Sequence, residues 1–563
     1  MLWEIPRGGA PGSKADADTK ARETMMLEWC SANNKPIGNK EPSQAFLWRC
    51  LDFLKEGGRA GMLVSAGVLF KNSSTTRSFR RQWMESVIIR EVFNFTHVRE
   101  LFFGKAISPF VAICFDRGKQ NDFPIKYWLA KRSKVMSDQT ILFSKQDIHT
   151  LRNEDFTSGK LWKTYSFGRL ADASFLKNLR PRHRMRDFVD REKSGLGYKL
   201  ASEDYCAEIL AKYNALDIKS FSRYDCLSFE PPPEKVHRFG KLDAYSGKRL
   251  LIQRGISQKG KTNGRIEARY EKQKFCFSQS IYGIKLKSSE DWRYKIILGI
   301  LWSSFCRYYL FSTSTDWGLW HHGMRLDDEL LQLPVVLDKD NRWTDQIIAI
   351  VDKLRNYRPQ RLDWLHPNGV PEAEIQARRC KWEDELDEAV FELYGLYEEQ
   401  KDLVRDCCEV TLPFLYDPFN SIGASPAVEN NNLSWIETYA RIFSRRWNAY
   451  LENGIEMRGT LHIGAHDNLV ALEFFPAEKS DPWDMNPKNN SWQNVLDRIG
   501  SALPHPMGTS QIIMDGVVHA VSDYAVIVVK RNERRFWTRS LAREDADSTL
   551  CKRMLMSNID GGG

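Results

Sequence analysis

Residues 43–70 have the sequence SQAFLWRCLDFLKEGGRAGMLVSAGVLF, in which one hydrophobic pattern gives way to another. In the first half, apolar side chains recur with the spacing of one helix face, at Phe46, Leu47, Cys50, Leu51 and Leu54. Gly57 and Gly58 follow, and glycine is common just past the end of a helix. The apolar run from Ala60 to Leu69 then predicts a strand that is buried on both faces, as strands of parallel sheets are.

The elements that follow extend this pattern. Residues 76–86 predict a second helix, with Arg77, Arg80 and Arg81 on one basic face. Residues 87–95 and 110–115 predict strands. The order helix, strand, helix, strand, strand is typical of one half of an open α/β sheet, so an α/β fold class is expected.

Later segments divide into further units. Short strand-like runs occupy residues 249–254, 265–270, 275–277 and 281–286, and residues 294–311 predict one apolar helix. Helices are expected at 343–356 and over the charged residues 372–407, followed by a Pro-, Asn- and Ser-rich linker at 414–432. The last unit is predicted to contain helices at 435–451 and 492–499 and strands at 469–474 and 525–530.

The bulk composition allows nucleic-acid binding and argues against several other classes. The 563 residues are 42% hydrophobic and carry a formal charge of +9, a moderately basic balance. No run approaches the roughly 18 apolar residues of a membrane span. The first residues lack a signal-peptide pattern, so a cytoplasmic protein is expected. The 11 cysteines are scattered without a CxxC pair, which favours reduced, structural cysteines.

A basic stretch at residues 248–274 is the candidate DNA-binding surface. Its cations stand among few acids and several glycines, at Arg249, Arg254, Lys259, Lys261, Arg265, Arg269 and Lys274. Such a loop suits phosphate contacts, and Arg254 or Arg265 is a candidate for bidentate contact with guanine. Trp317 is a candidate for insertion into DNA. The alternatives are a solvated hairpin with ordinary surface charges and, for Trp317, simple packing.

The sequence gives little support for a metal site or for the active site of a metal-dependent nuclease. His321 and His322 are adjacent and point in different directions, and Gly464 between His462 and His466 disfavours a shared helix face. We therefore predict no metal site. Glu473, Asp515 and Glu533 lie near the predicted strands of the last unit, but their spacing does not define the carboxylate cluster of a Mg²⁺-dependent nuclease.

The opening stretch also carries a family resemblance. Residues 43–65 resemble the segment downstream of the catalytic motif in adenine-N6 DNA methyltransferases, with Ser65 where that family often has proline. The resemblance continues through 92–95, 101–103 and 108–110. Residues 249–255, Tyr270, 275–277, 298–304, 308–309 and 330–334 resemble a target-recognition domain. Over residues 40–405 the order of motifs is closest to type IIG restriction–modification and related phage-defence methyltransferases.

The resemblance implies a domain plan. We expect an N-terminal arm (1–40), a partial methyltransferase domain with a Rossmann-like sheet (41–150) and a mixed α/β target-recognition domain (190–340). A helical spacer (341–412) and a C-terminal α+β domain of unknown role (433–550) would follow. The implied function is sequence-specific binding of duplex DNA within a restriction–modification or phage-defence system.

The two motifs that carry the family's chemistry are missing from the sequence. One is a Phe-x-Gly-x-Gly loop, in which glycines allow close approach to S-adenosylmethionine; the other is Asn/Asp-Pro-Pro-Tyr/Phe/Trp, which holds the flipped adenine. The nearest stretches, at 166–169, 462–466 and 486–488, fit neither motif.

We therefore predict no catalytic and no cofactor-binding residue in this chain. S-adenosylmethionine would be used only if a separate chain supplied the catalytic half, and other restriction or defence subunits are further expected partners. Three alternatives remain: a DNA specificity subunit that acts only through a catalytic partner, an enzyme of another class such as a nuclease, and a non-functional gene remnant.

Overall fold

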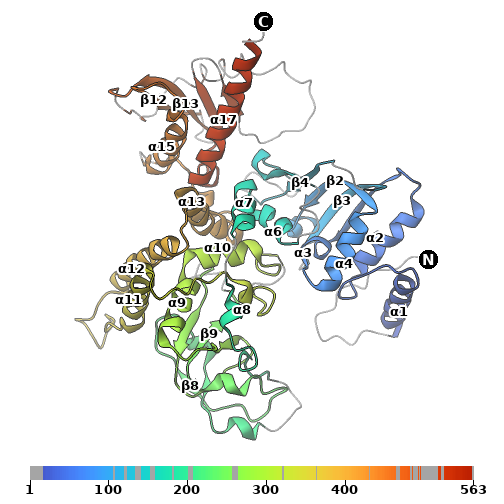
Figure 1. Cartoon of the computed structure of the whole chain (residues 1–563), viewed down its shortest axis with the longest axis vertical. Helices are drawn as coiled ribbons and strands as arrows, with labels where there is room; N and C mark the ends of the chain where they lie inside the picture. Colours follow the sequence, from blue (N-terminus) through green and yellow to red (C-terminus); the bar gives the residue numbers. More distant parts are fainter. Residues whose placement is uncertain are drawn as a thin grey trace. The chain divides into compact units, whose positions relative to one another are not determined.

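The computed structural model describes residues 17–104, 108–119, 123–132, 141, 143–152, 159–179, 183–200, 207–256, 264–319, 323–362, 364–429, 432–464, 469–481, 483, 485, 492, 495, 497, 518–521 and 525–560. The chain forms two compact units (Figure 1). The first comprises Met1–Ser166 together with Glu409–Gly563, and the second comprises Phe167–Cys408. Helices and several sheets occur in both, which confirms the predicted α/β fold class.

The N-terminal part of the first unit is a mixed five-stranded sheet with the order β1-β3-β2-β4-β5. Its strands are β1 (Arg59–Ser65), β2 (Val87–Asn94), β3 (Phe110–Arg117), β4 (Ile125–Leu129) and β5 (Ile148–Leu151). Because β3 is antiparallel to both β1 and β2, those two strands run in the same direction. The chain between them contains α4 (Ser74–Met84), and β2 pairs in parallel with β4. The predicted order helix, strand, helix, strand, strand is therefore confirmed.

The prediction for Ala60 to Leu69 was wrong in one respect. The strand ends at Ser65, and the apolar residues after it form the short buried helix α3 (Gly67–Phe70). In the described part of the chain β1 pairs only with β3, so it is an edge strand, and the Leu63 side chain is 54% exposed. One continuous apolar run thus covers two elements with different environments.

Aromatic packing and one buried arginine position the helices on this sheet. α2 (Pro42–Phe53) contributes Trp48, whose ring lies 6.0 Å from that of Phe79 on α4. Trp83 on α4 contacts Phe115 of β3 at 5.1 Å. Arg80 is buried and donates to the carbonyl oxygens of α3 residue Leu69 and of Lys71, and burial lowers its pKa to about 10. Arg80 therefore secures the end of α3. Before this sheet, α1 (Ala17–Ala32) is helical where an arm was expected, and it packs on α2.

The second unit combines a small antiparallel sheet with a set of helices. The sheet order is β10-β9-β11-β6, formed by β6 (Gly195–Leu196), β9 (Arg249–Gln253), β10 (Ala268–Glu271) and β11 (Ile281–Ile284). The main helices are α9 (Asp291–Trp302), α10 (Ser304–Thr313), α11 (Arg342–Asn356), α12 (Glu372–Leu393) and α13 (Glu398–Asp406). Residues 275–277, predicted as a strand, form only an isolated bridge at Cys276.

The single helix predicted at 294–311 is two helices in the structure. Ser303 has extended backbone angles, and its hydroxyl accepts a hydrogen bond from the Cys306 amide at 3.2 Å, which caps α10. Trp302 ends α9 and donates its indole N–H to the Ala268 carbonyl oxygen at 2.9 Å. This bond attaches α9 to β10.

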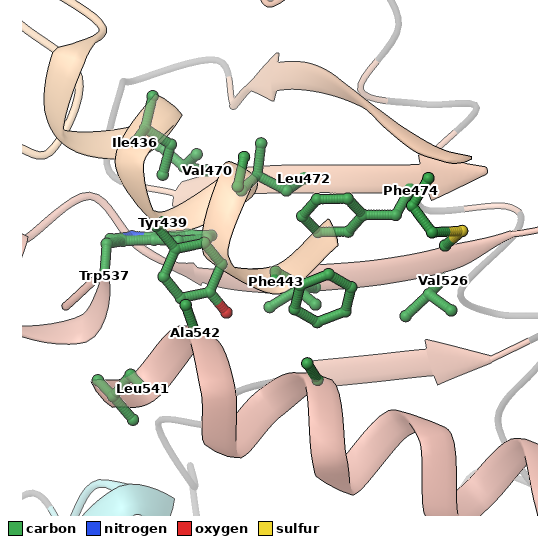
Figure 2. Close-up of a cluster of buried hydrophobic side chains, with 14 of the residues drawn as sticks. Ile436, Tyr439, Phe443, Val470, Leu472, Phe474, Val526, Trp537, Leu541 and Ala542 are labelled. Carbon is green, nitrogen blue, oxygen red and sulfur yellow. The ribbon is translucent and has the colours of Figure 1, made fainter. Parts of the chain in front are cut away.

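The C-terminal part of the first unit is a second antiparallel sheet with the order β12-β13-β15-β14, and two long helices pack on one of its faces. Its elements are α15 (Ser434–Asn448), β12 (Ile455–Ile463), β13 (Leu469–Glu478), β14 (Val518–Val521), β15 (Val526–Arg531) and α17 (Arg539–Asp560). Figure 2 shows the core between sheet and helices, where the rings of Phe443 and Phe474 stack at 4.0 Å. The predicted helix at 492–499 lies largely outside the described residues.

A buried charged group lies within this helix–sheet interface. The ammonium group of Lys530 on β15 contacts the carboxylate of Asp545 on α17, and Tyr439 of α15 also donates to that carboxylate. His519 on β14 lies 3.1 Å from the second carboxylate oxygen. Burial would raise the pKa of Asp545, but Lys530 and His519 outweigh it and hold this pKa well below its usual range.

Asp545→Asn is expected to lower the free energy of local unfolding by about 3–5 kcal/mol near neutral pH, because Lys530 is left buried without its counter-charge. Since the folded-state pKa is depressed, this stabilisation is present above the unfolded-state pKa near 4 and is lost as the pH falls toward the folded value. Hydrogen exchange of β15 and α17 amides measures both effects. Asp547→Asn is the matched control, because Asp547 pairs with Arg446 on the surface and its loss should cost less than about 1 kcal/mol. Equal loss of protection in the two variants would contradict the assignment.

Candidate nucleic-acid interface

The predicted DNA-binding stretch at 248–274 contains β9, a connection and β10. Lys259 and Lys261 lie outside the described residues. The other five cations divide into two groups, because some are held in the interior of the second unit and others reach its surface.

Two of these arginines are buried. Arg249 donates to the Gly247 carbonyl oxygen at 2.9 Å and lies over the Phe275 ring at 4.5 Å; burial lowers its pKa to about 10. Arg269 donates to the carbonyl oxygens of Ser222 (2.8 Å) and Asp225 (2.6 Å). The sequence prediction placed both on a DNA-facing surface, whereas the structure gives them contacts that stabilise the fold.

Trp317 is also an interior residue. Its side chain is fully buried, and its ring lies 5.4 Å from that of Phe311 at 72°. This arrangement fits the packing alternative, and insertion into DNA would require the side chain to leave the core.

The remaining cations are accessible. Arg254 directly follows β9, and its side chain is exposed while its backbone is fixed by hydrogen bonds with Ser280 (2.8 Å) and Met324 (3.0 Å). Lys274 is exposed, with its ammonium group 5.0 Å from the Tyr213 ring centroid. Arg265 is partly exposed and forms an ion pair of 2.5 Å with Glu383. Of the five described cations predicted to contact DNA, Arg254 and Lys274 therefore present their charge to solvent.

Glu383 joins the loop before β8 (Phe229–Glu230) to α12. Its buried carboxylate accepts hydrogen bonds from Arg223 (3.1 Å) and from the Tyr224 hydroxyl (2.5 Å), in addition to its ion pair with Arg265. Burial raises the pKa of Tyr224, so this hydroxyl keeps its proton and remains a donor. The donors come from two parts of the chain, the adjacent Arg223 and Tyr224 and, about 40 residues later, Arg265, and Glu383 holds them together.

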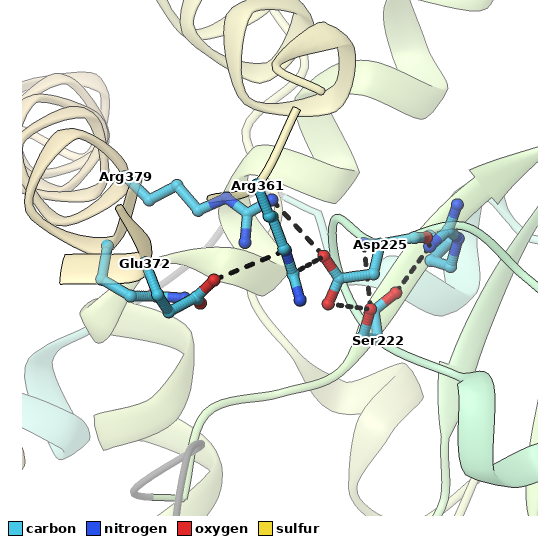
Figure 3. A network of polar contacts seen from close by, with 7 residues as sticks. Ser222, Asp225, Arg361, Glu372 and Arg379 are labelled. Atoms are coloured by element: carbon cyan, nitrogen blue, oxygen red, sulfur yellow. Dashed lines mark hydrogen bonds and ion pairs between the residues drawn. The ribbon is translucent and has the colours of Figure 1, made fainter. Parts of the chain in front are cut away.

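A second polar network lies beside the first (Figure 3). Asp225 forms ion pairs with Arg361 at 2.8 Å and with Arg379 of α12 at 3.5 Å, and Arg361 also lies 3.4 Å from Glu372. The Asp225 amide donates to the Ser222 hydroxyl at 3.0 Å. These contacts attach the 222–225 loop to α12 and to the connection between α11 and α12.

A cavity of about 530 Å³ opens next to this loop. Its charged lining consists of four arginines and one glutamate, at Arg223, Arg269, Arg355, Arg358 and Glu271. Sequence reasoning included Arg269 and missed the other three arginines, because they come from segments far from the 248–274 stretch. The spacing of Arg355, Arg358 and Arg361 was a visible signal, since three cations recur within seven residues.

The described residues contain neither a metal-binding cluster nor a helix that could span a membrane. Among the described residues, no group of three or more His, Cys, Asp and Glu side chains is placed to hold a metal ion. His462 lies 3.2 Å from Glu473, whereas His321, His322 and His466 lie outside the described residues. None of the described helices is both long enough and apolar enough to span a membrane.

Residues 17–168 match the family model of N-6 DNA methylases. The match covers the N-terminal sheet, 152 (168 − 17 + 1) of the 563 residues. It confirms for this segment the resemblance to adenine-N6 DNA methyltransferases drawn from the sequence. No curated protein sequence matches the chain.

Two solved structures show loose similarity. The type IIG restriction endonuclease BpuSI is 12% identical, with coverage of 68% of this chain and 53% of that one and a TM-score of 0.25. The type IIL restriction–modification enzyme MmeI, solved in complex with DNA, is 13% identical, with coverage of 72% and 55% and a TM-score of 0.40. This chain spans about half the length of each. Both TM-scores are too low to establish a shared fold.

Glu383→Gln is expected to destabilise the second unit by about 3–5 kcal/mol, because the buried Arg223 loses its counter-charge. For a unit of this size, the melting temperature should fall by roughly 2–4 °C per kcal/mol. Thermal unfolding measures the change. Glu374→Gln on the same helix removes only an exposed ion pair with Arg378 and should change the melting temperature little. Identical melting of both variants and the wild type would show that Glu383 is not a structural anchor.

Proposed function

We propose that this chain is the DNA-binding portion of an adenine-N6 DNA methyltransferase that acts in restriction–modification or phage defence. The observation that carries the proposal is the match of residues 17–168 to the N-6 DNA methylases. The sheet formed by these residues supports it, because the matched segment is a folded core with helices packed on it. Target recognition is assigned to the second unit, whose β9–β10 region carries the exposed cations.

Methyl transfer is proposed to require residues that this sequence does not contain. Neither the glycine-rich cofactor loop nor the Asn/Asp-Pro-Pro-aromatic motif occurs in the chain. Those motifs bring the cofactor close to the backbone and hold the flipped adenine. The β1 edge supports the idea of a catalytic half from elsewhere, because an edge strand with the exposed Leu63 is suited to pairing with another strand.

The DNA contacts are assigned to Arg254 and Lys274, with Arg265 beside them. Arg254 is exposed on a backbone fixed at both its amide and its carbonyl, which suits a guanidinium that must meet a base edge in one orientation. Lys274 is a point charge on a flexible stem and suits a phosphate. Lys259 and Lys261 remain predicted phosphate contacts.

Titration of labelled duplex DNA at several salt concentrations tests this assignment. Arg254→Ala is expected to weaken binding by about 1–3 kcal/mol if Arg254 contacts a guanine. Lys274→Ala is expected to reduce the slope of log affinity against log salt concentration by about one. Lys339→Ala, which removes an exposed cation from the loop before α11, is the matched control. If all three variants bind as the wild type does at low salt, the interface lies elsewhere.

Binding of S-adenosylmethionine to the same sample tests the second half of the proposal. We expect no saturable binding by the chain alone, because close approach of the cofactor needs the missing glycine loop. Calorimetric titration measures it. Tight binding would show that a cofactor pocket exists in this chain and that methyl transfer does not depend on another polypeptide.

A DNA specificity subunit is the second candidate, and the absence of both catalytic motifs favours it. The two candidates differ in what a catalytic half would do. Addition of a chain that carries the cofactor and adenine motifs should produce adenine methylation if β1 completes a methyltransferase sheet. A specificity subunit would instead direct an already complete enzyme to its target without pairing at β1.

A further inference from the structure

The arginine-lined cavity of the second unit has the size and lining of a ligand site. Its volume of about 530 Å³ falls within the range of small-molecule pockets. Four segments form its walls: the loop at 223–229, β10 with Gln273, Trp302 at the end of α9, and the C-terminal end of α11 with Arg358. The Phe229 side chain is 40% exposed at this cavity, with its ring 5.1 Å from that of Phe275. The site therefore combines cations with an accessible aromatic face.

Two of the lining arginines are already held in place. Arg355 donates to the Tyr270 carbonyl oxygen at 3.0 Å, and its guanidinium lies 5.0 Å from the centroid of the Tyr270 ring. Arg269 is bound to two backbone carbonyl groups and to Glu271 at 3.0 Å. Glu271 is thus already paired, and the two guanidinium groups are fixed before any ligand arrives.

Arg358 differs because it forms no ion pair with a described carboxylate, although Asp225 lies near enough to act on its charge. No described carboxylate oxygen lies within 4.0 Å of its guanidinium, whereas the neighbouring Arg355 and Arg361 each have such partners. Burial and the nearby charge of Arg269 lower the pKa of Arg358, whereas the carboxylate of Asp225 opposes this and Arg379 adds to it. A cation held next to other cations is stabilised by an anion.

The helix end does not account for this surplus charge. The last turn of α11 carries a partial negative charge on its unpaired carbonyl groups, and Lys353 and Arg355 within that turn balance it. Arg358 lies beyond the Tyr357 cap, outside the last turn. The excess positive charge of the cavity therefore remains after the helix dipole is considered.

We propose that this cavity binds the phosphate group of a nucleotide, with Arg358 as the main phosphate contact and the base against Phe229. Guanidinium groups match phosphate oxygens in geometry, and aromatic rings stack with any base. The nucleotide is either a free mononucleotide or one unit of a bound DNA strand. Only the second source rests on the proposed function.

The test compares Arg358→Gln with Arg342→Gln, which removes an exposed arginine from the other end of the same helix. Both side chains are exposed, so both variants should fold. One probe is fluorescent mant-dAMP, with inorganic phosphate as competitor, and the other is a fluorescein-labelled DNA duplex. Loss of one charge-assisted contact should weaken the affinity for the probe by about tenfold or more in Arg358→Gln. The affinity of Arg342→Gln should remain that of the wild type.

The pattern of binding identifies the source of the nucleotide. Phosphate-competed binding of mant-dAMP that depends on Arg358 supports a free nucleotide, and this result stands even if the duplex does not bind. Duplex binding that depends on Arg358 supports a nucleotide of the DNA. Duplex binding that depends on Arg254 and Lys274 but not on Arg358, together with no Arg358-dependent binding of mant-dAMP, would overturn the cavity proposal and leave the proposed function intact. Absence of Arg358-dependent binding to both probes would also overturn it.

Discussion

The carboxylate of Glu383 is the contact on which the arrangement of the second unit depends. It is buried, and it meets donors from Arg223, Tyr224 and Arg265. A carboxylate in a low-dielectric interior is stable only with such partners, and each partner would be costly to leave unpaired. The loop that carries Arg223 also forms one wall of the arginine-lined cavity, so the buried ion group determines where that wall lies. Asp225, two residues further on, repeats the same attachment through Arg361 and Arg379.

This constraint divides the cations of the unit by role. Arg223, Arg249 and Arg269 donate hydrogen bonds to groups inside the unit and stabilise its fold. Arg254, Lys274 and Arg358 retain charge that faces solvent or the cavity. The net charge of +9 counts buried and exposed cations alike, so it does not show how many cations are available to a ligand. Long-range attraction of a polyanion depends on the available ones alone.

The sequence predicted well those elements whose hydrophobic period is clear. The helix at 76–86, the strands at 87–95 and 110–115 and the helix at 343–356 agree with the structure within a few residues. Errors arose where one apolar run covers two elements. At 60–69 a strand passes into a buried helix, and at 303 a serine cap divides two buried helices within one largely apolar stretch. The spacing of apolar residues indicates which side chains are buried, but it does not indicate the hydrogen bond at which a helix or strand ends.

The candidate site was harder to predict for a related reason. The cations within 248–274 look alike in the sequence, yet the side chain of Arg249 on β9 is buried, whereas Arg254 lies just past the end of that strand. The partner that decides the state of Arg265 is Glu383, more than 100 residues away. Charge density along the chain indicates a candidate region, but tertiary pairing decides which of its cations remain available.

The division into two units limits how the proposed activities can be connected. The chain leaves the first unit at Ser166 and returns to it at Glu409, so the second unit is an insertion with its own core. The β1 edge belongs to the first unit, and the cations at 254, 274 and 358 belong to the second. Changes at sites without shared partners have nearly additive effects on free energy. The proposed pairing with a catalytic half at β1 and the proposed binding of DNA by the second unit are therefore expected to respond separately to substitution, so that a loss of one does not by itself imply a loss of the other.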